Sequence, residues 1–239
     1  MVVGLPAAGK SLACEVLETR LQRDGYQVTR LSDKSAFETE VRRDVGANGR
    51  PGSEPGSLEG KHCILLNPEA PPGTLRVLFK DAAALLNGAH EALLREVASR
   101  VDDGNASRVL LVEWAYGVDH AGGSQPLRQS GTQLVLWLRE FGLAGRAVVL
   151  DVVADYAERE RRNLARRDSI PRGEFGRYFP EAGHLRPEDV RYLGRRYTRI
   201  ENAGVTREKF QEIVAERYGS VLAPVLPRLS ARPGRVALS

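Results

Sequence analysis

Apolar residues follow two different spacings along this chain, and the two spacings alternate. Near the start they recur every three to four positions, which predicts a helix with one apolar face formed by Leu12, Ala13, Val16, Leu17 and Leu21. Further along, short runs in which nearly every residue is apolar, at 109–112 and 147–153, predict strands that are buried on both faces. Because strands and helices take turns, we expect a parallel sheet covered by helices on both sides.

Weaker patterns complete the predicted sheet and its helices. Residues 26–31 predict the second strand and residues 197–201 the last one, which a helix from about Thr206 follows. Asp81 is placed to cap a long helix, and another helix is predicted over 134–141. Together the elements predict an α/β fold, a three-layer α/β/α sandwich around a mainly parallel five-stranded sheet.

One stretch after the second strand interrupts the alternation. Residues 44–60 are rich in Gly, Pro, Ser and Asn, which predicts a mobile loop. Residues 63–66 and 75–79 then predict two short extended segments. We therefore interpret about 44–80 as an insertion into the sandwich.

Composition narrows the class of protein. Among 239 residues, 42% are hydrophobic and 28% charged, which is ordinary for a globular domain, and we assign 1–223 to it. Residues 224–239, with three prolines and few large apolar groups, predict a loosely ordered tail. No apolar run approaches the roughly 18 residues of a membrane span and no signal segment opens the chain, so a cytoplasmic protein is expected. Two cysteines and four scattered histidines predict neither a disulfide scaffold nor a structural metal.

The most specific motif is GLPAAGKS at residues 4–11, which matches the G-x-x-x-x-G-K-[ST] pattern of a phosphate-binding loop. Its glycines let backbone N–H groups curl around phosphate oxygens, and the following helix aims its positive end at them. Lys10 is expected to reach the β- and γ-phosphates, and Ser11 to bind Mg²⁺. The residues predicted to hold the nucleotide are Gly4, Pro6, Ala7, Ala8, Gly9, Lys10, Ser11 and Leu12. Only residues 1–3 precede the loop, which is short for a central strand.

Four features in order make the sequence resemble the P-loop kinases, which phosphorylate nucleosides, nucleotides and small metabolites. They are the GLPAAGKS loop, Asp33 after the second strand, an arginine-rich stretch from Arg159, and IENAGVTREKF at the last strand. The resemblance implies ATP as the phosphoryl donor and Mg²⁺ as the cofactor. It also implies a mobile, arginine-rich lid at about 165–190 that closes over ATP.

Two acidic residues have candidate roles in phosphoryl transfer. Asp33, at the tip of a strand, is placed to accept a proton from an acceptor hydroxyl; the alternative is that it caps the next helix, with Ser32 as helper. Glu113, after the most apolar strand, is the candidate to hold Mg²⁺ together with Ser11. Asp119 is its rival for the metal or the acceptor, or else a residue of a solvated turn.

Basic and polar residues late in the chain are further candidates. Arg159, Arg162 and Arg166 fall at steps of three and four and share one face of a predicted helix, where arginines can bridge phosphate oxygens. The alternative is a solvated helix face paired with nearby glutamates. Asn202 and Gly204 either line the adenine pocket or form a turn between strand and helix.

These residues predict an ATP- and Mg²⁺-dependent kinase that phosphorylates a hydroxyl of a small molecule, with Lys10, Asp33, Arg162 and Arg166 as catalytic residues. A nucleoside monophosphate kinase is the first alternative, although its acceptor needs no base. A nucleotide switch or ATPase that acts on a partner protein or RNA is another alternative. A GTP-dependent switch is not indicated, because the chain lacks the Asn-Lys-x-Asp sequence with which GTPases recognise guanine. Positive net charge admits an RNA end as acceptor, yet aromatic residues for base stacking are only 6%.

Overall fold

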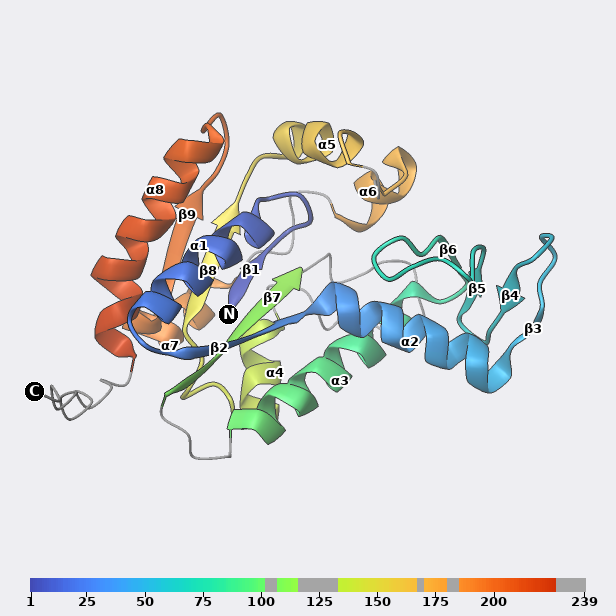
Figure 1. Cartoon of the computed structure of the whole chain (residues 1–239), viewed down its shortest axis with the longest axis horizontal. Coiled ribbons are helices and arrows are strands. Elements are labelled where there is room, and N and C mark those ends of the chain that lie inside the picture. Colours follow the sequence, from blue (N-terminus) through green and yellow to red (C-terminus); the bar gives the residue numbers. More distant parts are fainter. Residues whose placement is uncertain (102–106, 116–132, 167–169, 180–184, 227–239) are drawn as a thin grey trace, which may run out of the picture.

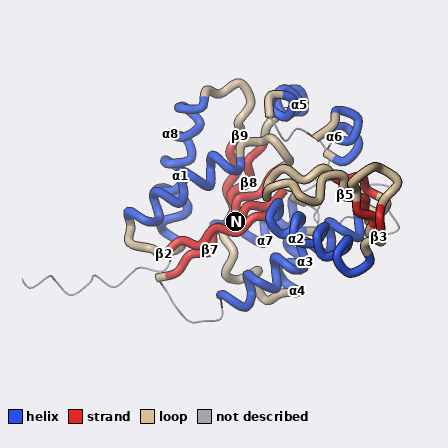
Figure 2. Tube along the Cα trace, turned by 45° about the vertical axis from the view of Figure 1, so that its right-hand side comes forward, coloured by secondary structure: helices blue, strands red, loops and turns tan. Residues whose placement is uncertain are grey.

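A computed structural model describes residues 1–101, 107–115, 133–166, 170–179 and 185–226 of the chain. Its main feature is a five-stranded sheet in the order β2-β7-β1-β8-β9, in which every neighbouring pair is parallel. Helices cover both faces, with α1 and α8 on one side and α2, α3 and α4 on the other (Figures 1 and 2). The predicted three-layer sandwich is confirmed.

The strands of this sheet and helices α1, α3, α4, α5 and α8 lie close to their predicted positions, whereas α2, α6 and α7 have no predicted counterpart. The strands are β1 (Val2–Gly4), β2 (Gln27–Ser32), β7 (Arg108–Ala115), β8 (Val149–Val153) and β9 (Tyr197–Glu201). The helices are α1 (Lys10–Arg23), α2 (Asp33–Asn48), α3 (Ala82–Val101), α4 (Leu134–Glu140), α5 (Tyr156–Leu164), α6 (Arg172–Tyr178), α7 (Pro187–Leu193) and α8 (Arg207–Arg217). Asp81 caps the start of α3 as expected, since its Oδ1 accepts a hydrogen bond from the Ala84 N–H.

Alternation along the strands builds two separate cores. Val2 and Leu150 point to the α1 and α8 side, whereas their neighbours Val3 and Val149 point to the α3 and α4 side. All four side chains are at most 1% exposed, as expected for strands covered on both faces. Asp151 on β8 is a buried polar exception, and its Oδ2 accepts a hydrogen bond from the Tyr197 hydroxyl at 2.9 Å. Although β1 has only three residues, it is paired on both sides, with β7 and β8.

The register brings the ends of the central strands to one edge. Gly4 is level with Ala115, and Ser32 is level with Glu113. Helix α1, after β1, packs on one face of the sheet and α4, after β7, on the other. In parallel α/β sheets such an arrangement at the carboxyl ends of two strands favours ligand binding. The phosphate-binding loop, Asp33 and Glu113 all lie at this edge.

The region after β2 corrects one expectation. Residues 44–60 are not one continuous loop: α2 continues to Asn48, and a second, antiparallel sheet follows in the order β3-β4-β5-β6, at the right of Figure 1, so only residues 49, 52–57 and 60 of this stretch lie outside helices and strands. Its strands are β3 (Arg50–Pro51), β4 (Leu58–Glu59), β5 (Cys63–Leu65) and β6 (Val77–Phe79). Buried Asp44 holds β5 to α2, because its Oδ2 accepts hydrogen bonds from the N–H groups of His62 and Cys63. The two extended segments expected in the insertion correspond to β5 and β6.

The C-terminal part begins as predicted and ends partly outside the described residues. The Asp155 side chain caps α5 by accepting from the Glu158 N–H, and the Thr206 side chain caps α8 by accepting from the Lys209 N–H. Helical turns at Tyr218–Leu222 and Ala223–Val225 follow α8. The remainder of the predicted tail, and parts of the predicted lid, are not among the described residues.

Candidate active site

The backbone of the phosphate-binding loop requires its glycines. Gly4 has φ 151°, and a Cβ there would lie 2.3 Å from the carbonyl oxygen of Val152. Gly9 has φ 108°, and its Cβ would lie 2.3 Å from Nδ2 of Asn202. Ala7 also adopts the left-handed region, with φ 64°. Side chains at the two glycines would collide with neighbours, so the spacing of the motif follows from local geometry.

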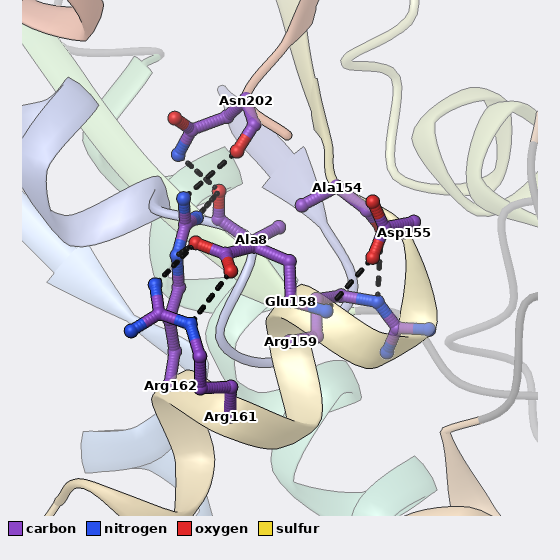
Figure 3. A network of polar contacts seen from close by, with 8 residues as sticks. All are labelled: Ala8, Ala154, Asp155, Glu158, Arg159, Arg161, Arg162 and Asn202. Atoms are coloured by element: carbon purple, nitrogen blue, oxygen red, sulfur yellow. Dashed lines mark hydrogen bonds and ion pairs between the residues drawn. The ribbon is translucent and has the colours of Figure 1, made fainter. Parts of the chain in front are cut away.

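Two polar side chains from other elements hold the outside of the loop (Figure 3). Asn202 donates from Nδ2 to the Ala8 carbonyl at 2.7 Å, and Arg162 donates to the same carbonyl at 3.3 Å. Arg162 also donates to the Asn202 carbonyl at 2.8 Å and to Glu158 at 2.7 Å. Buried Asn202 therefore supports the loop backbone, and Arg162 links that loop to α5 and β9.

Lys10 begins α1 and is buried beneath the loop. Its Nζ donates a hydrogen bond to the Leu5 carbonyl at 3.0 Å. Burial lowers the pKa of Lys10, while the nearby carboxylates of Asp33 and Glu113 oppose that change. The ammonium group thus lies among the acids predicted for catalysis and metal binding, at the N-terminus of a 14-residue helix that favours anions.

The two residues predicted to hold Mg²⁺ are in contact. Ser11 Oγ donates to Glu113 Oε1 at 2.7 Å, and Arg30 on β2 pairs with Glu113 Oε2 at 2.9 Å. Glu113 lies on β7 itself, which continues to Ala115 and does not end at the glutamate as expected. A hydroxyl and a carboxylate beside a phosphate loop fit Mg²⁺, which keeps several waters and takes its other ligands from phosphates. Among the described residues no larger cluster of metal-binding side chains occurs.

Asp33 opens α2 at the end of β2. Ser32, not Asp33, is the N-cap, since its side chain accepts from the Ser35 N–H at 3.2 Å. Asp33 Oδ2 accepts from the Ala115 N–H, and Oδ1 accepts from the Lys34 N–H at 2.8 Å. Burial raises the pKa of Asp33, against the opposing effects of His90 and Lys10. The carboxylate therefore joins the ends of the neighbouring strands β2 and β7 and does not serve as the N-cap of α2.

His90 on α3 is a functional candidate that the sequence did not reveal. It is 1% exposed, packs edge-on against Trp114 with ring centroids 4.2 Å apart, and its Nδ1 lies 2.6 Å from the Leu86 carbonyl. A carbonyl only accepts, so Nδ1 carries the proton. Nε2 has no hydrogen-bond partner among the described residues and lies 3.9 Å from Asp33 Oδ2. One histidine in an apolar helix gives no signal for such a contact.

The three arginines predicted to share one helix face divide into different roles. Arg159 is fully buried and donates to the carbonyls of Ala154 and Phe179, so it holds α5 to the α6 region. Arg162 reaches the loop backbone, as described above. Arg166 lies beyond the end of α5, because the helix stops at Leu164, and it lines the cavity beside the phosphate loop. The prediction that Arg166 shares a helix face with Arg159 and Arg162 is therefore wrong, although Arg166 does lie near the phosphate loop.

Lys10, Ser11, Asp33, His90, Glu113 and Arg166 line one cavity of about 860 Å³. We call its two parts the loop half and the insertion half. The loop half is lined by Pro6, Ala7, Gly9, Lys10, Ser11, Leu12, Glu113 and Arg166. The insertion half is lined by Phe37, Leu66, Leu75, Val77, Phe79 and Leu86, with Asp33 and His90 between the halves. Asp119 lies outside the described residues. Within the described chain, no helix is both long and apolar enough to cross a membrane.

Comparisons with known proteins add similarity of fold. No family model and no curated protein matches the sequence. An unliganded sugar kinase from Janibacter sp. is 11% identical, with 96% of each chain covered and a TM-score of 0.48. The protein TT1252 from Thermus thermophilus is 18% identical, with 95% of this chain and 96% of that chain covered and a TM-score of 0.43. With TM-scores under 0.5 and these identities, neither likeness carries a conclusion about this chain.

Proposed function

We propose that this protein is an ATP- and Mg²⁺-dependent kinase that transfers the γ-phosphoryl group to a hydroxyl of a small molecule. One observation carries the proposal: Lys10, the Ser11–Glu113 pair and Asp33 meet in a single cavity that continues beyond them toward the insertion. Lys10, Ser11 and Glu113 would bind a nucleoside triphosphate and its Mg²⁺. Asp33 would bind the hydroxyl of the acceptor.

In the proposed reaction the residues position the reactants and stabilise charge. The loop N–H groups and Lys10 bind the phosphates, and Arg166 approaches the transferring group from the α5 side. Ser11 and Glu113 would hold Mg²⁺, which neutralises charge on the phosphates when bound. Asp33 takes the proton of the acceptor hydroxyl as its oxygen bonds to the γ-phosphorus, and the bond to the β-phosphate oxygen breaks to release ADP.

A hydroxyl acceptor suits the junction better than the phosphate of a nucleoside monophosphate. Asp33 lies where the acceptor would meet the γ-phosphate, and its side chain is only 14% exposed. A second anion beside a carboxylate of low exposure would be repelled. A neutral hydroxyl instead finds a hydrogen-bond acceptor there, so the buried Asp33 favours the kinase for alcohols over its first alternative.

The test is a panel of acceptors incubated with ATP and Mg²⁺ and scored for phosphorylated product by mass spectrometry. The panel holds nucleosides, nucleotides, sugars, amino alcohols, simple alcohols and short RNAs. We expect an alcohol to accelerate ADP formation, and Lys10→Ala to lower that rate at least about 10³-fold because the phosphates lose a buried cation. Lys209→Ala is the matched control, since Lys209 is exposed on α8 and pairs with Glu212. ADP formation that no acceptor accelerates, or that persists in Lys10→Ala, would contradict the proposal.

A further inference from the structure

The insertion half of the cavity has an apolar wall. Its side chains come from three elements: Phe37 from α2, Leu86 from α3, and Val77 with Phe79 from β6. Leu75 from the turn before β6 belongs to the same surface. The aromatic rings of Phe37 and Phe79 lie 5.9 Å apart at 51°, so they form one tilted pair.

The wall is fixed in place by a core of its own. Val41, Val45, Cys63, Leu65 and Leu85 form a buried cluster between the insertion and the two helices, and the side chains of the wall pack against it. The wall residues Phe37, Leu75, Val77 and Phe79 are only partly buried, which leaves their other surface toward the cavity. A ligand that covers this surface gains from removing apolar area from water.

Polar groups in this half are few and unevenly placed. Glu38 lines the cavity, but both of its carboxylate oxygens accept from the Gly73 N–H, at 2.8 and 2.9 Å. Lys34 and Arg76 also line it, and both are exposed to solvent. Buried polar atoms directed at a ligand occur at the junction, where Asp33 Oδ2 and His90 Nε2 lie 3.9 Å apart.

Both atoms accept hydrogen bonds, because Nδ1 carries the proton of His90, so one hydroxyl placed between them donates its single proton to Asp33 Oδ2 or to His90 Nε2. The junction therefore suits one hydroxyl, and among the described residues the wall behind it offers no buried polar partner for a second. A polyol placed there would lose hydration at its other hydroxyls without replacing the lost hydrogen bonds. An apolar ring would instead pack against the aromatic and aliphatic side chains of the wall and lose only apolar contact with water.

From this arrangement we infer that the acceptor is a small alcohol whose single reacting hydroxyl is attached to an apolar, ring-sized body, and that polyols such as free sugars are poor acceptors. The inference rests on the proposed function and adds the chemical class of the acceptor. The hydroxyl lies at Asp33 and His90, and the apolar body lies on the wall formed by Phe37, Leu75, Val77, Phe79 and Leu86.

The first experiment compares 2-phenylethanol and cyclohexylmethanol with glucose and ribose, each with ATP and Mg²⁺. We expect kcat/KM for the two apolar alcohols to exceed that for the sugars by about 100-fold. Binding of 2-phenylethanol is measured separately by saturation-transfer NMR, without ATP, so that occupancy of the pocket does not depend on catalysis.

The matched variants change the wall and leave the loop half intact. Val77→Thr keeps the branched shape that β6 favours and adds one hydroxyl to the wall, so we expect binding of 2-phenylethanol to weaken about tenfold with ATP affinity unchanged. Leu75→Asp is the stronger variant and should abolish binding of the apolar alcohols. Leu164→Asp is the control, because Leu164 is 55% exposed at the end of α5 and does not line the cavity.

The outcomes separate this inference from the proposed function. Binding of 2-phenylethanol that Leu75→Asp abolishes supports the apolar pocket, and if no alcohol is then phosphorylated, the kinase proposal alone fails. Preferential phosphorylation of glucose or ribose overturns the acceptor class and leaves the kinase standing. If 2-phenylethanol does not bind, or binds equally to the Leu75→Asp protein, the inference is wrong.

Discussion

The loop half and the insertion half of the cavity differ in how their polar groups are satisfied. In the loop half, Ser11, Glu113 and Arg30 hold one another, and the Ala8 carbonyl accepts from Asn202 and Arg162. In the insertion half the wall is apolar, and the buried Nε2 of His90 at its edge has no partner among the described residues. A preorganised polar site suits a ligand of constant charge, such as a triphosphate, because the protein needs little rearrangement to bind it. An apolar surface with one polar junction suits a ligand that is recognised by shape.

The largest effect should come from the residue between the halves. Asp33→Asn removes the proposed base but can still accept the Ala115 N–H through its amide oxygen. We expect kcat to fall about 10²- to 10⁴-fold, with ATP affinity measured by calorimetry unchanged.

The same residue sets the expected pH dependence. Burial raises the pKa of Asp33 above 3.8, and only the ionised form accepts a proton, so activity should rise with pH through that raised pKa and be lost as the pH falls below it. This acid limb should be missing from the residual activity of Asp33→Asn. A normal rate in Asp33→Asn would show that the base is another group.

A smaller effect separates two arginines near the phosphate loop, Arg166 in the loop half and Arg162 outside the cavity lining. Arg166→Ala should lower kcat about 10- to 100-fold without changing the melting temperature, because Arg166 lines the cavity and its contact strengthens as charge develops. Arg162→Ala should instead destabilise the fold by about 1–2 kcal/mol, since the carbonyls of Ala8 and Asn202 each lose a donor. Steady-state kinetics and thermal unfolding of both variants make the comparison. If Arg166→Ala and Arg162→Ala lose the same activity and have the same melting temperature, the proposed difference between a catalytic arginine and a stabilising one is wrong.

The smallest effect tests the edge of the insertion half. His90→Asn keeps an amide near Nδ1 for the Leu86 carbonyl and removes Nε2. Protonated His90 and Lys10 lower the pKa of Asp33, whereas burial and Glu113 raise it. We therefore expect the acid limb of kcat/KM to move to higher pH in His90→Asn, with a several-fold loss on the acid limb and little change on the plateau above it. His62→Asn, in the insertion, is the control, and an unchanged profile in His90→Asn would assign His90 a packing role alone.

A structural feature could be predicted from the sequence where it depends on residues that are close together in the chain. The loop was predictable because Gly4 and Gly9 need backbone angles and space that only glycine provides, and Asp33 because strand ends meet at one edge of a parallel sheet. The contact of Arg30 with Glu113, and that of His90 with Asp33, depend on which strands and helices become neighbours, and no local pattern records this. The insertion was only half predicted, because strands of two or three residues are too short to show a period. Roles in catalysis remain predictions for every residue of the site.

The separate core beneath the insertion has an evolutionary consequence. The wall packs against Val41, Cys63, Leu65 and their neighbours, whereas the phosphate loop packs against the two cores of the main sheet. We therefore expect substitutions in the part of the wall between residues 49 and 80 to disturb the fold around Lys10 and Glu113 less than substitutions in the two main cores. Under the proposed function, selection for a new acceptor would act first on these residues, and related chains should differ most between residues 49 and 80.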